Sequence, residues 1–309
     1  MKSMIADGTL ACLDCYDADP WLLFGLFEAL DQLPVSALEM SAAVYEKLRS
    51  FDIFSGTDKQ LRLRCSDEAG QKACPGFDGY IVLDHSPESE EELVFCRSAD
   101  GACLFRRRQG FDALVGILPA AVFHQLLQQD AALELAPMNR CHAATAMAVE
   151  WCRMGGRRVL TALNGLGGLA CSEEVLMALY IRGKLETDSL QCLQDARVFL
   201  EAVMQEKIPP KKAVLGSEIF AVEAGIHVDG ITKNPQLYEP YEPSFAGLQR
   251  HIVVGKHSGR QALLAKAAEL HVGLGADPDR ILMRLQQRCT CQERSLSDDE
   301  FRRLLRDAL

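Results

Sequence analysis

Short apolar runs alternate with helix-like segments over the first two-thirds of the chain, and this alternation restricts the fold more than any other feature. Gly79–Asp84 and Ala113–Leu118 read as buried strands, whereas Trp21–Leu33 and Ser172–Ile181 read as helices. Strands that alternate with helices indicate a parallel β-sheet whose strands are joined by helical crossovers. With 309 residues, 48% of them hydrophobic, the chain can bury one large core.

Capping residues place several helix boundaries. Asp19 and Pro20 are suited to the N-cap and the first position of a helix, and Ser172 to an N-cap with Glu173 and Glu174 in the first turn. A capping box from Ser297 to Glu300 opens the last helix. The remaining predicted elements are strands at 4–13, 37–40, 132–135 and 159–163, and helices at 119–129, 143–154 and 298–308. A further helix is predicted by the helical spacing of apolar residues from Leu190 to Val203, and Pro209 and Pro210 end it.

The residue composition and periodicity of the chain change at about residue 225. Residues 225–259 are rich in Gly, Pro, Tyr and His and show no helical period, so we expect an irregular segment there. A long non-periodic segment within a compact protein is usually functional.

Composition excludes several classes of function. A formal net charge of -10 without a long basic cluster argues against nucleic acid or anionic membrane as a partner. No run approaches 18 apolar residues and the N-terminus lacks the apolar core of a signal peptide, so we expect a cytoplasmic protein with no membrane span. The 12 cysteines then read mostly as small buried hydrophobes. Cys12 and Cys15 form a single Cys-x2-Cys knuckle, whereas a structural zinc site usually needs two.

Three segments resemble a known enzyme family. The first is Ala6-Asp-Gly-Thr-Leu, and the second runs from Ala144 through Asn164-Gly-Leu-Gly to Leu179. The third is Phe220-Ala-Val-Glu-Ala-Gly-Ile-His-Val-Asp-Gly-Ile-Thr-Lys-Asn-Pro, followed by Leu237-Tyr-Glu-Pro and Val254-Gly-Lys-His-Ser-Gly-Arg. Together they resemble the homocitrate synthase / 2-isopropylmalate synthase family, and the second segment resembles its sixth and seventh βα units.

The resemblance implies a (β/α)8 TIM barrel followed by a lid and a small helical subdomain. We expect the barrel at 1–216, with trimmed βα units between 51 and 135, the lid at 217–259 and the helical subdomain at 260–309. Only about 50 residues follow Gly259, so the chain resembles the short, nitrogen-fixation type of homocitrate synthase, without a leucine-sensing domain. Family members dimerise by exchanging the lid region, which implies an obligate dimer.

Members of this family condense acetyl-CoA with a 2-oxo acid in a Claisen-type reaction. A divalent metal (Mg, Mn or Zn) polarises the keto carbonyl, and a base removes a proton from the acetyl methyl group. The metal is held by the Asp of an Arg-Asp-Gly-Glu motif on the first strand, by a His-x-His pair on the sixth, and by an Asn after the seventh. These positions lie at the C-terminal ends of barrel strands.

In this chain all four ligand positions carry other residues. The Asp is replaced by Cys12, the two His by Ala136 and Met138, and the Asn by Ser172, which reads equally as a helix cap. Hard divalent cations prefer oxygen ligands, so we expect no metal cofactor in this chain. An alternative stays open, in which Cys12 joins neighbouring side chains in a softer zinc site, namely Cys15, Asp14 and His142.

The lid motif, in contrast, is intact. His227 and Tyr238 match a His and a Tyr that reach over the partner subunit's barrel in the family, where they assist deprotonation and hold the substrates. Gly225 and Gly230 would permit unusual backbone angles beside His227. By the same resemblance, the substrate-binding residues are Asn164, Asp229 and Lys233.

Three functions remain open on these grounds. The first is a non-catalytic partner subunit whose lid completes the active site of an intact paralogue; the expected assembly is a homodimer or a heterodimer with that paralogue. The second is an active acyltransferase with a relocated metal site, acting on acetyl-CoA and a 2-oxo acid. The third is a non-enzymatic barrel that binds a small molecule or regulates another protein. Loss of the ligands counts against the second, and the intact lid counts against the third.

Overall fold

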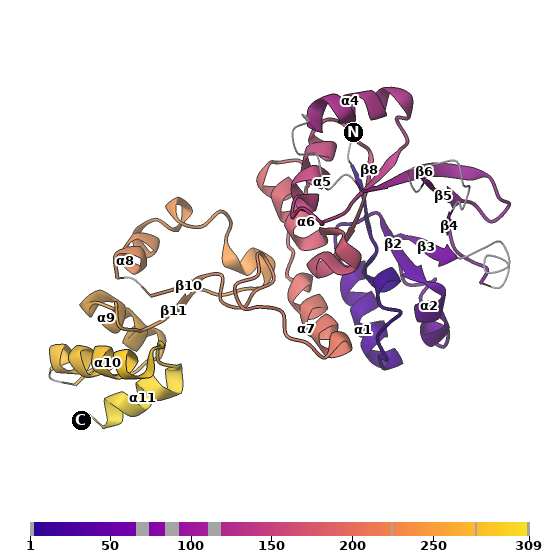
Figure 1. Ribbon diagram of the computed structural model, residues 1–309. Helices are drawn as coiled ribbons and strands as arrows, with labels where there is room; N and C mark the ends of the chain where they lie inside the picture. The colour runs from indigo at the N-terminus through magenta and orange to yellow at the C-terminus, as the bar shows by residue number, and fades with distance from the viewer. Residues whose placement is uncertain are drawn as a thin grey trace. The chain divides into compact units, whose positions relative to one another are not determined.

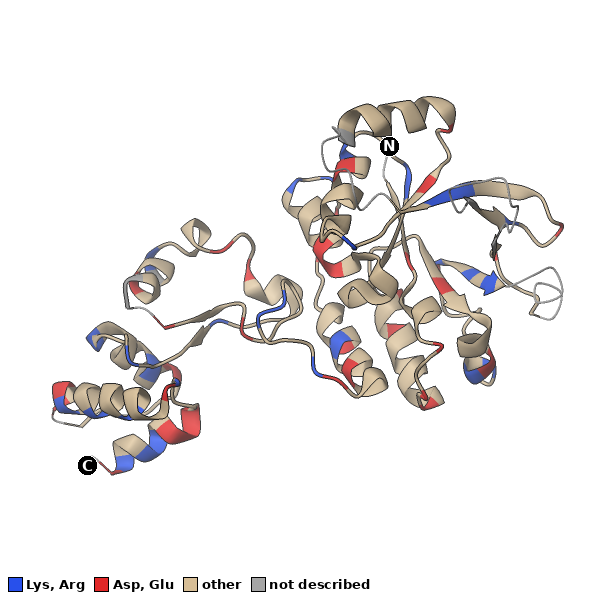
Figure 2. Ribbon diagram, in the orientation of Figure 1, with Lys and Arg blue, Asp and Glu red and all other residues tan. Residues whose placement is uncertain are grey.

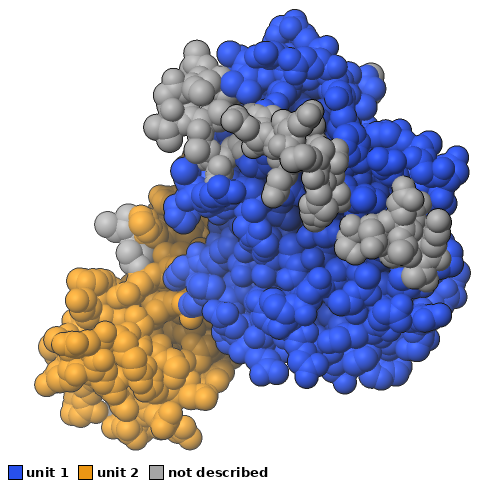
Figure 3. All heavy atoms as spheres, turned by 45° about the vertical axis from the view of Figure 1, so that its right-hand side comes forward, with its two compact units in different colours: residues 1–215 blue, residues 216–309 orange. Residues whose placement is uncertain are grey.

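The structure is a computed structural model that describes residues 3–65, 74–83, 93–110, 119–223, 225–275 and 277–307. The chain forms two compact units, residues 1–215 and residues 216–309 (Figure 3). Each unit contains a cluster of buried apolar side chains of its own, so the two are described separately.

The first unit is a closed barrel of eight strands with helices on its outside (Figure 1). Neighbours pair in chain order, and the parallel pairing of the eighth strand with the first closes the ring. The (β/α)8 fold class is therefore confirmed. The strands are β1 (Met4–Asp7), β2 (Ala37–Ser41), β3 (Gln60–Cys65), β4 (Gly79–Leu83), β5 (Leu93–Arg97), β6 (Cys103–Gly110), β7 (Glu134–Pro137) and β8 (Arg158–Ala162), with the short β9 (Ala170–Cys171) beside β8.

The helices of this unit begin close to the predicted positions. Asp19 caps α1 by accepting the N–H of Trp21 at 2.8 Å, and Pro20 is its first residue, as predicted. Trp151 on α5 is fully buried and packs edge-on against Phe123 of α4 with ring centroids 5.3 Å apart. The helices described here are α1 (Pro20–Asp31), α2 (Ala42–Leu48), α4 (Pro119–Gln129), α5 (Ala144–Arg153), α6 (Ser172–Ile181) and α7 (Cys192–Met204).

One part of the ring departs from the (β/α)8 pattern. β5 pairs antiparallel with both β4 and β6, whereas the other pairs in the ring are parallel. β4, β5 and β6 therefore form a meander where a regular barrel has helical crossovers. This agrees with trimmed βα units between 51 and 135. The strand predicted at 113–118 lies outside the described residues.

Two predictions about strands are wrong in detail. The segment likened to the sixth and seventh units, Ala144 to Leu179, begins at α5 after β7 and contains β8, so it belongs to the end of the seventh unit and to the eighth unit of this ring. The first strand ends at Asp7 rather than at Leu13, because the chain turns into the short 3-10 helix η1 (Thr9–Cys12). The Asp7 carboxylate stabilises this turn by accepting the N–H of Thr9 at 2.9 Å.

A buried ion network ties strands together inside the barrel. Arg107 of β6 is fully buried between Glu39 of β2 and Glu134 of β7, with N···O distances of 2.5 and 2.6 Å. Arg62 of β3 donates to Glu134 at 2.7 Å, and Arg64 of β3 donates to Glu39 at 2.8 Å. Figure 2 shows basic residues on β3 and β6 in blue. Burial alone would raise the pKa of Glu39, but Arg107 and Arg64 outweigh it and lower the pKa to about 2.

The second unit is a small helical subdomain with a two-stranded parallel sheet. Its core gathers buried apolar side chains of α9, α10 and α11 around Val254 and Leu296. The predicted capping box is confirmed, since Ser297 and Glu300 cap α11 reciprocally. The elements are β10 (Ala221–Val222), α8 (Gly225–Lys233), η3 (Pro235–Leu237), η4 (Pro243–Ala246), β11 (His251–Ile252), α9 (Arg260–Glu269), α10 (Pro278–Gln292) and α11 (Asp298–Arg306).

The expectation that residues 225–259 are irregular throughout is wrong, because they begin with the helix α8. Its first and sixth residues are the glycines Gly225 and Gly230, which weaken a helix prediction made from propensity alone. Val228 of α8 is buried and Ile231 is half-buried, so packing stabilises a helix that the local sequence disfavours. Among the described residues, no helix is long and apolar enough to cross a membrane.

The ion network predicts a pH-dependent stability. Glu39→Gln leaves Arg107 and Arg64 short of a counter-charge, and we expect a loss of about 3–5 kcal/mol in unfolding free energy at pH 7. A lowered pKa stabilises the fold above the ordinary glutamate value of 4.5, and this stabilisation disappears as pH falls toward about 2. The difference between wild type and variant should therefore be smaller at pH 3 than at pH 7.

Urea unfolding followed by tryptophan fluorescence measures this, since both tryptophans, Trp21 and Trp151, lie in the first unit. Glu46→Gln is the control, because Glu46 forms an exposed pair with Arg49 that is worth about 1 kcal/mol or less. An equal loss at both pH values would contradict the assignment.

Candidate functional site

The four positions that correspond to family metal ligands meet at one end of the barrel. Cys12 ends η1, Ala136 lies on β7, Met138 follows that strand, and Ser172 begins α6. We call the apolar group around them the mouth cluster. It consists of Ala6, Ala37, Ala136, Leu160, Ala162 and Leu169, with Cys12, Met138 and Leu166 packed against it.

The loop η2 (Leu163–Gly168) packs tightly against this cluster. A Cβ on Gly167 would lie 2.6 Å from the Cys12 sulfur, and a Cβ on Gly168 would lie 3.4 Å from the Met138 Cε. Asn139 donates its N–H to the Gly168 carbonyl at 2.7 Å, which fastens the loop to the residues after β7. The left-handed φ of Gly167, +65°, lets the loop turn at this contact. The mouth is thus lined by close apolar contacts.

These residues do not fit a divalent metal. Ala136 has no donor atom, and the Met138 thioether is a poor ligand for hard cations. Burial raises the pKa of the Cys12 thiol to about 11, so the cost of deprotonating Cys12 adds to the lack of oxygen ligands.

Ser172 has a structural partner instead of a metal. It donates to the fully buried Asp7 carboxylate, and its hydroxyl also lies 2.7 Å from that of Thr161. Burial raises the pKa of Asp7 although Ser172 and Thr9 both donate to it. The prediction that Ser172 caps α6 is wrong, because the N-cap is Cys171 and no side chain caps that end.

The alternative zinc ligands are not brought together. Asp14 accepts a hydrogen bond from Ser41, and the side chains of Cys15 and His142 are exposed. His142 has a left-handed φ of +57° and donates its N–H to the Asn139 carbonyl at 3.2 Å, as expected for a turn residue.

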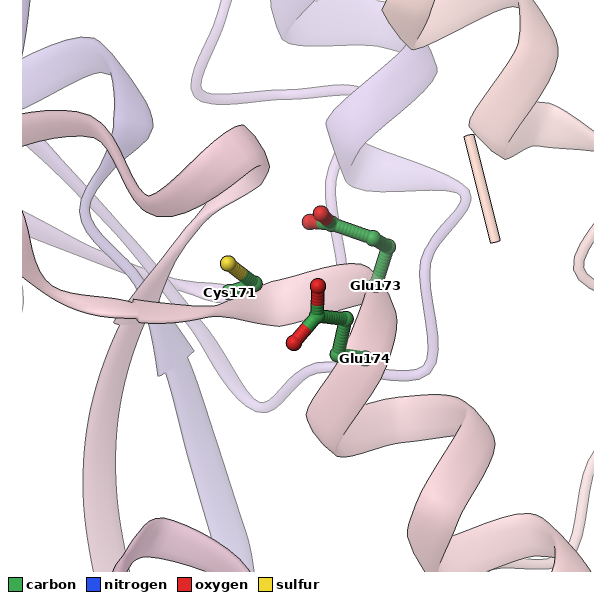
Figure 4. Close-up of side chains that lie close together, drawn as sticks. All are labelled: Cys171, Glu173 and Glu174. Atoms are coloured by element: carbon green, nitrogen blue, oxygen red, sulfur yellow. The ribbon is translucent and has the colours of Figure 1, made fainter. Parts of the chain in front are cut away.

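Within the described residues, the metal-type ligands that do meet are Cys171, Glu173 and Glu174, at the start of α6. Their ligand atoms lie within 4.8 Å of one another (Figure 4). A cation of the protein already occupies the centre, because the Lys212 ammonium lies 3.4 Å from the Cys171 sulfur and 2.9 Å from Glu173, and also contacts Glu174. Burial would lower the pKa of Lys212, but Glu173 and Glu174 raise it. This group is therefore an internal ion cluster that fastens residues 209–215 to the barrel rim.

Asn164 lies beside this ion cluster. Its N–H donates to Glu173 at 3.0 Å, and its φ of +55° is left-handed. The sequence resemblance assigned Asn164 to substrate, and the contact that the structure describes is made by its backbone.

In the second unit, the structure brings His227 and Tyr238 together. Their ring centroids lie 5.9 Å apart with an interplanar angle of 58°, and both residues are exposed. Asp229 and Lys233 form an exposed ion pair of 2.7 Å along α8, one turn apart. The expectation that Gly230 has an unusual backbone angle is wrong, because Gly230 lies within α8 and its φ is negative.

Several residues with a part in these sites were missed from the sequence. Lys212 and Arg250 are charged residues on irregular segments, and nothing in the sequence around Glu239 indicates which residue it pairs with. Lys212 lies at the centre of the ion cluster, and Arg250 binds Glu239 through both carboxylate oxygens. Their partners are 8 to 41 residues away, farther than the spacings of local helix and turn patterns.

The comparisons with known proteins agree on one family. A family model described as "Homocitrate synthase post-HMGL domain-like" matches residues 214–290. The "2-isopropylmalate synthase 2" of Caldanaerobacter subterraneus is 35% identical over 227 residues, 70% of this chain and 59% of that protein. The "Homocitrate synthase, omega subunit" of Clostridium pasteurianum is 32% identical over 165 residues, 53% of this chain and 47% of that protein.

The chain spans 59% and 47% of the length of these two relatives. Among solved structures, the HMG-CoA lyase of Bacillus subtilis has a TM-score of 0.47 and 14% identity, over 67% of this chain and 95% of that one. The barrel assignment rests on the strand pairing of this chain alone.

The ion cluster at α6 predicts a large effect of removing its cation. Lys212→Met leaves the fully buried Glu173 without its counter-ion, and we expect a loss of about 3–5 kcal/mol in unfolding free energy at pH 7. Burial already raises the pKa of Glu173, and without Lys212 it should rise further. A raised folded pKa favours the fold below the unfolded value of 4.5 and disfavours it above.

The deficit of Lys212→Met should therefore be smaller at pH 4 than at pH 7, by urea unfolding with tryptophan fluorescence. The adjacent, exposed Lys211 provides the control variant Lys211→Met. A deficit no larger than that of Lys211→Met would mean that the ion cluster does not stabilise the fold.

Proposed function

The chain belongs to the homocitrate synthase / 2-isopropylmalate synthase family, and from this premise we propose that it is a non-catalytic partner subunit. Its own barrel performs no condensation, and its lid supplies His227 and Tyr238 to the barrel of an intact paralogue. The complex would condense acetyl-CoA with a 2-oxo acid in the cytoplasm.

One contrast carries this proposal. At the barrel mouth, the positions of the family ligands are filled by the close apolar packing of Cys12, Ala136 and Met138. In the second unit, His227 and Tyr238 remain exposed and adjacent, with their ring centroids 5.9 Å apart. A chain that lost the reaction altogether would have no reason to keep an exposed histidine beside an exposed tyrosine.

The chemistry assigns different parts of the reaction to the two chains. Condensation needs a polarised keto carbonyl and a base that removes a proton from the acetyl methyl group. The mouth cluster offers no group that polarises a carbonyl, so that task falls to the partner's barrel. The imidazole of His227 can act as the proton acceptor, and the hydroxyl of Tyr238 can donate a hydrogen bond to substrate. Asp229 and Lys233, which pair across one turn of α8, are proposed to contact substrate beside His227 and Tyr238.

A relative's printed name gives independent support. The Clostridium pasteurianum protein is named as the omega subunit of a homocitrate synthase, so a member of this family is known as one subunit among others. We call His227 and Tyr238 the lid pair. For the present chain, a heterodimer with an intact paralogue accounts for the exposed lid pair better than a homodimer does. In a homodimer, both lids would cover barrel mouths that cannot react.

A second candidate function is an acyltransferase with a relocated metal. It is favoured by the meeting of Cys171, Glu173 and Glu174 at the start of α6. Lys212 weighs against it, because its ammonium already neutralises these ligands. A metal would have to displace a buried ion pair before it could bind.

The first functional prediction concerns the chain alone. With acetyl-CoA and 2-oxoglutarate or 2-oxoisovalerate, the purified chain should release no CoA above background, because nothing polarises the keto carbonyl. A thiol-reactive dye measures free CoA, with Mg²⁺, Mn²⁺ or Zn²⁺ added in turn. Turnover that a chelator abolishes would favour the relocated-metal candidate, and Lys212→Met would then test where that metal binds.

The second functional prediction concerns the complex with an intact paralogue. A positioned histidine contributes about 10²–10⁴-fold to a proton-transfer step. His227→Ala in this chain should therefore lower the turnover of the co-expressed complex by at least about tenfold without dissociating it. Tyr238→Phe should give a smaller loss, because the ring stays and only the hydroxyl is removed. Size-exclusion chromatography checks assembly, and CoA release gives the rate.

His124→Ala is the matched control, since His124 is exposed on α4 in the barrel unit. A complex that forms, turns over and keeps its full rate with His227→Ala would rule out the donated lid.

A further inference from the structure

We propose that Gly230 is a positioning residue for the lid pair, an inference that rests on the proposed function of His227 and Tyr238. The missing side chain at this point of α8 leaves the space in which the Tyr238 ring lies beside His227. Gly230 thereby sets the separation of two groups that would act on the substrates.

The contact at Gly230 is unusually close. A Cβ at this position would lie within 2.6 Å of three atoms of the Tyr238 ring system, Oη, Cζ and Cε2. Atoms of a rigid aromatic ring cannot move aside separately, so any side chain here would displace the whole ring. Because the φ of Gly230 is negative, the residue is not explained by backbone conformation.

Helix stability argues in the same direction. Glycine within a helix costs about 0.8–1.0 kcal/mol relative to alanine, and α8 has only nine residues. The helix alone would be more stable with alanine at position 230. The close contact with Tyr238 supplies the reason for glycine.

Helical periodicity places the contact next to His227. Residues three apart in a helix share a face, so His227 and Gly230 lie on the same side of α8. A ring whose hydroxyl end contacts Gly230 is therefore brought beside the imidazole. This accounts for the 5.9 Å separation of the His227 and Tyr238 ring centroids.

The turn that carries Tyr238 is fixed by hydrogen bonds of its own backbone and by an ion pair. The Asn234 N–H donates to the Gly230 carbonyl at 2.8 Å where α8 ends, and the Tyr238 N–H donates to the Pro235 carbonyl at 2.9 Å. Next along the chain, Glu239 accepts from Arg250, with Nε to Oε1 at 2.7 Å and Nη2 to Oε2 at 2.7 Å.

Arg250 precedes β11 and also binds Glu242 at 2.7 Å, so it fastens this turn to the strand. The Glu239 side chain is only 6% exposed, and a paired, desolvated carboxylate of this kind is held firmly. With the backbone of the turn clamped, a side chain at position 230 could be accommodated only if the exposed Tyr238 ring turned away from His227, so Gly230 leaves the space in which the ring lies.

Nuclear magnetic resonance of the chain alone tests the contact. The Cε1–H signal of His227, assigned with His227→Gln, reports the neighbouring Tyr238 ring through its ring current. Tyr238→Phe should leave this signal nearly in place, whereas Tyr238→Ala should move it. Gly230→Ala should move it in the same direction as Tyr238→Ala, and adding Gly230→Ala to Tyr238→Ala should produce little further change.

Gly273→Ala is the matched control, because no atom lies within 4 Å of a Cβ at that position in the same unit. It should leave the His227 signal unchanged. Arg250→Met gives a second route should Gly230→Ala fail to fold, since it frees the Tyr238 turn without altering α8. The proposal is overturned if the His227 signal does not move in Gly230→Ala. If only Arg250→Met folds, an unmoved His227 signal in that variant overturns it instead.

The functional consequence is measured on the complex with the intact paralogue. Gly230→Ala should lower kcat by about the factor found for Tyr238→Ala, with KM changed less than twofold, and the double variant should be no worse than either. Full kcat in Gly230→Ala also overturns the positioning role. If no active complex forms at all, the proposed function fails, whereas the resonance result still decides whether Gly230 sets the ring pair.

Discussion

The placement of Arg107 between Glu39 and Glu134 is the interaction on which the barrel depends. It joins β6, which belongs to the antiparallel meander, to β2 and β7, which belong to the regular parallel part. All three side chains are fully buried, so each charge needs the others, and removing one leaves an unpaired charge in a medium of low dielectric. The meander can replace helical crossovers because its last strand is held in the ring by these ion pairs.

Along β7, the surroundings of the side chains change from a buried ion network to the apolar mouth cluster within two residues. Side chains two apart on a strand face the same side, so Glu134 and Ala136 both face the ion network's side of β7. Glu134 is charged and paired, whereas Ala136 belongs to an apolar group that η2 covers. A family metal site needs several polar ligands in the place where this chain has methyl groups and a thioether. Apolar packing fills the positions that correspond to the ligands.

The lid pair follows a different physical rule. Its geometry comes from a glycine, a clamped turn and the three-residue spacing of His227 and Gly230, all within the second unit. None of these contacts needs the barrel mouth to be reactive. This independence explains how a chain can keep an ordered His–Tyr pair after its own mouth has become apolar.

Local chemistry in the sequence determined much of this protein. Alternation of strands and helices predicted a parallel sheet with helical crossovers, and Asp19 and Ser297 predicted helix ends that the structure confirms. The motif around His227 indicated the family, and the barrel was implied by that resemblance. These features depend on residues within a few positions of one another. The sequence misjudged α8, whose two glycines mask a helix that packing stabilises, and it assigned Ser172 to a cap when its partner, Asp7, is 165 residues away. Only the tertiary structure decided which charges meet, that Lys212 fills the centre of Cys171, Glu173 and Glu174, and that Gly230 makes room for Tyr238, because these contacts arise from chain closure over distances that no local pattern encodes.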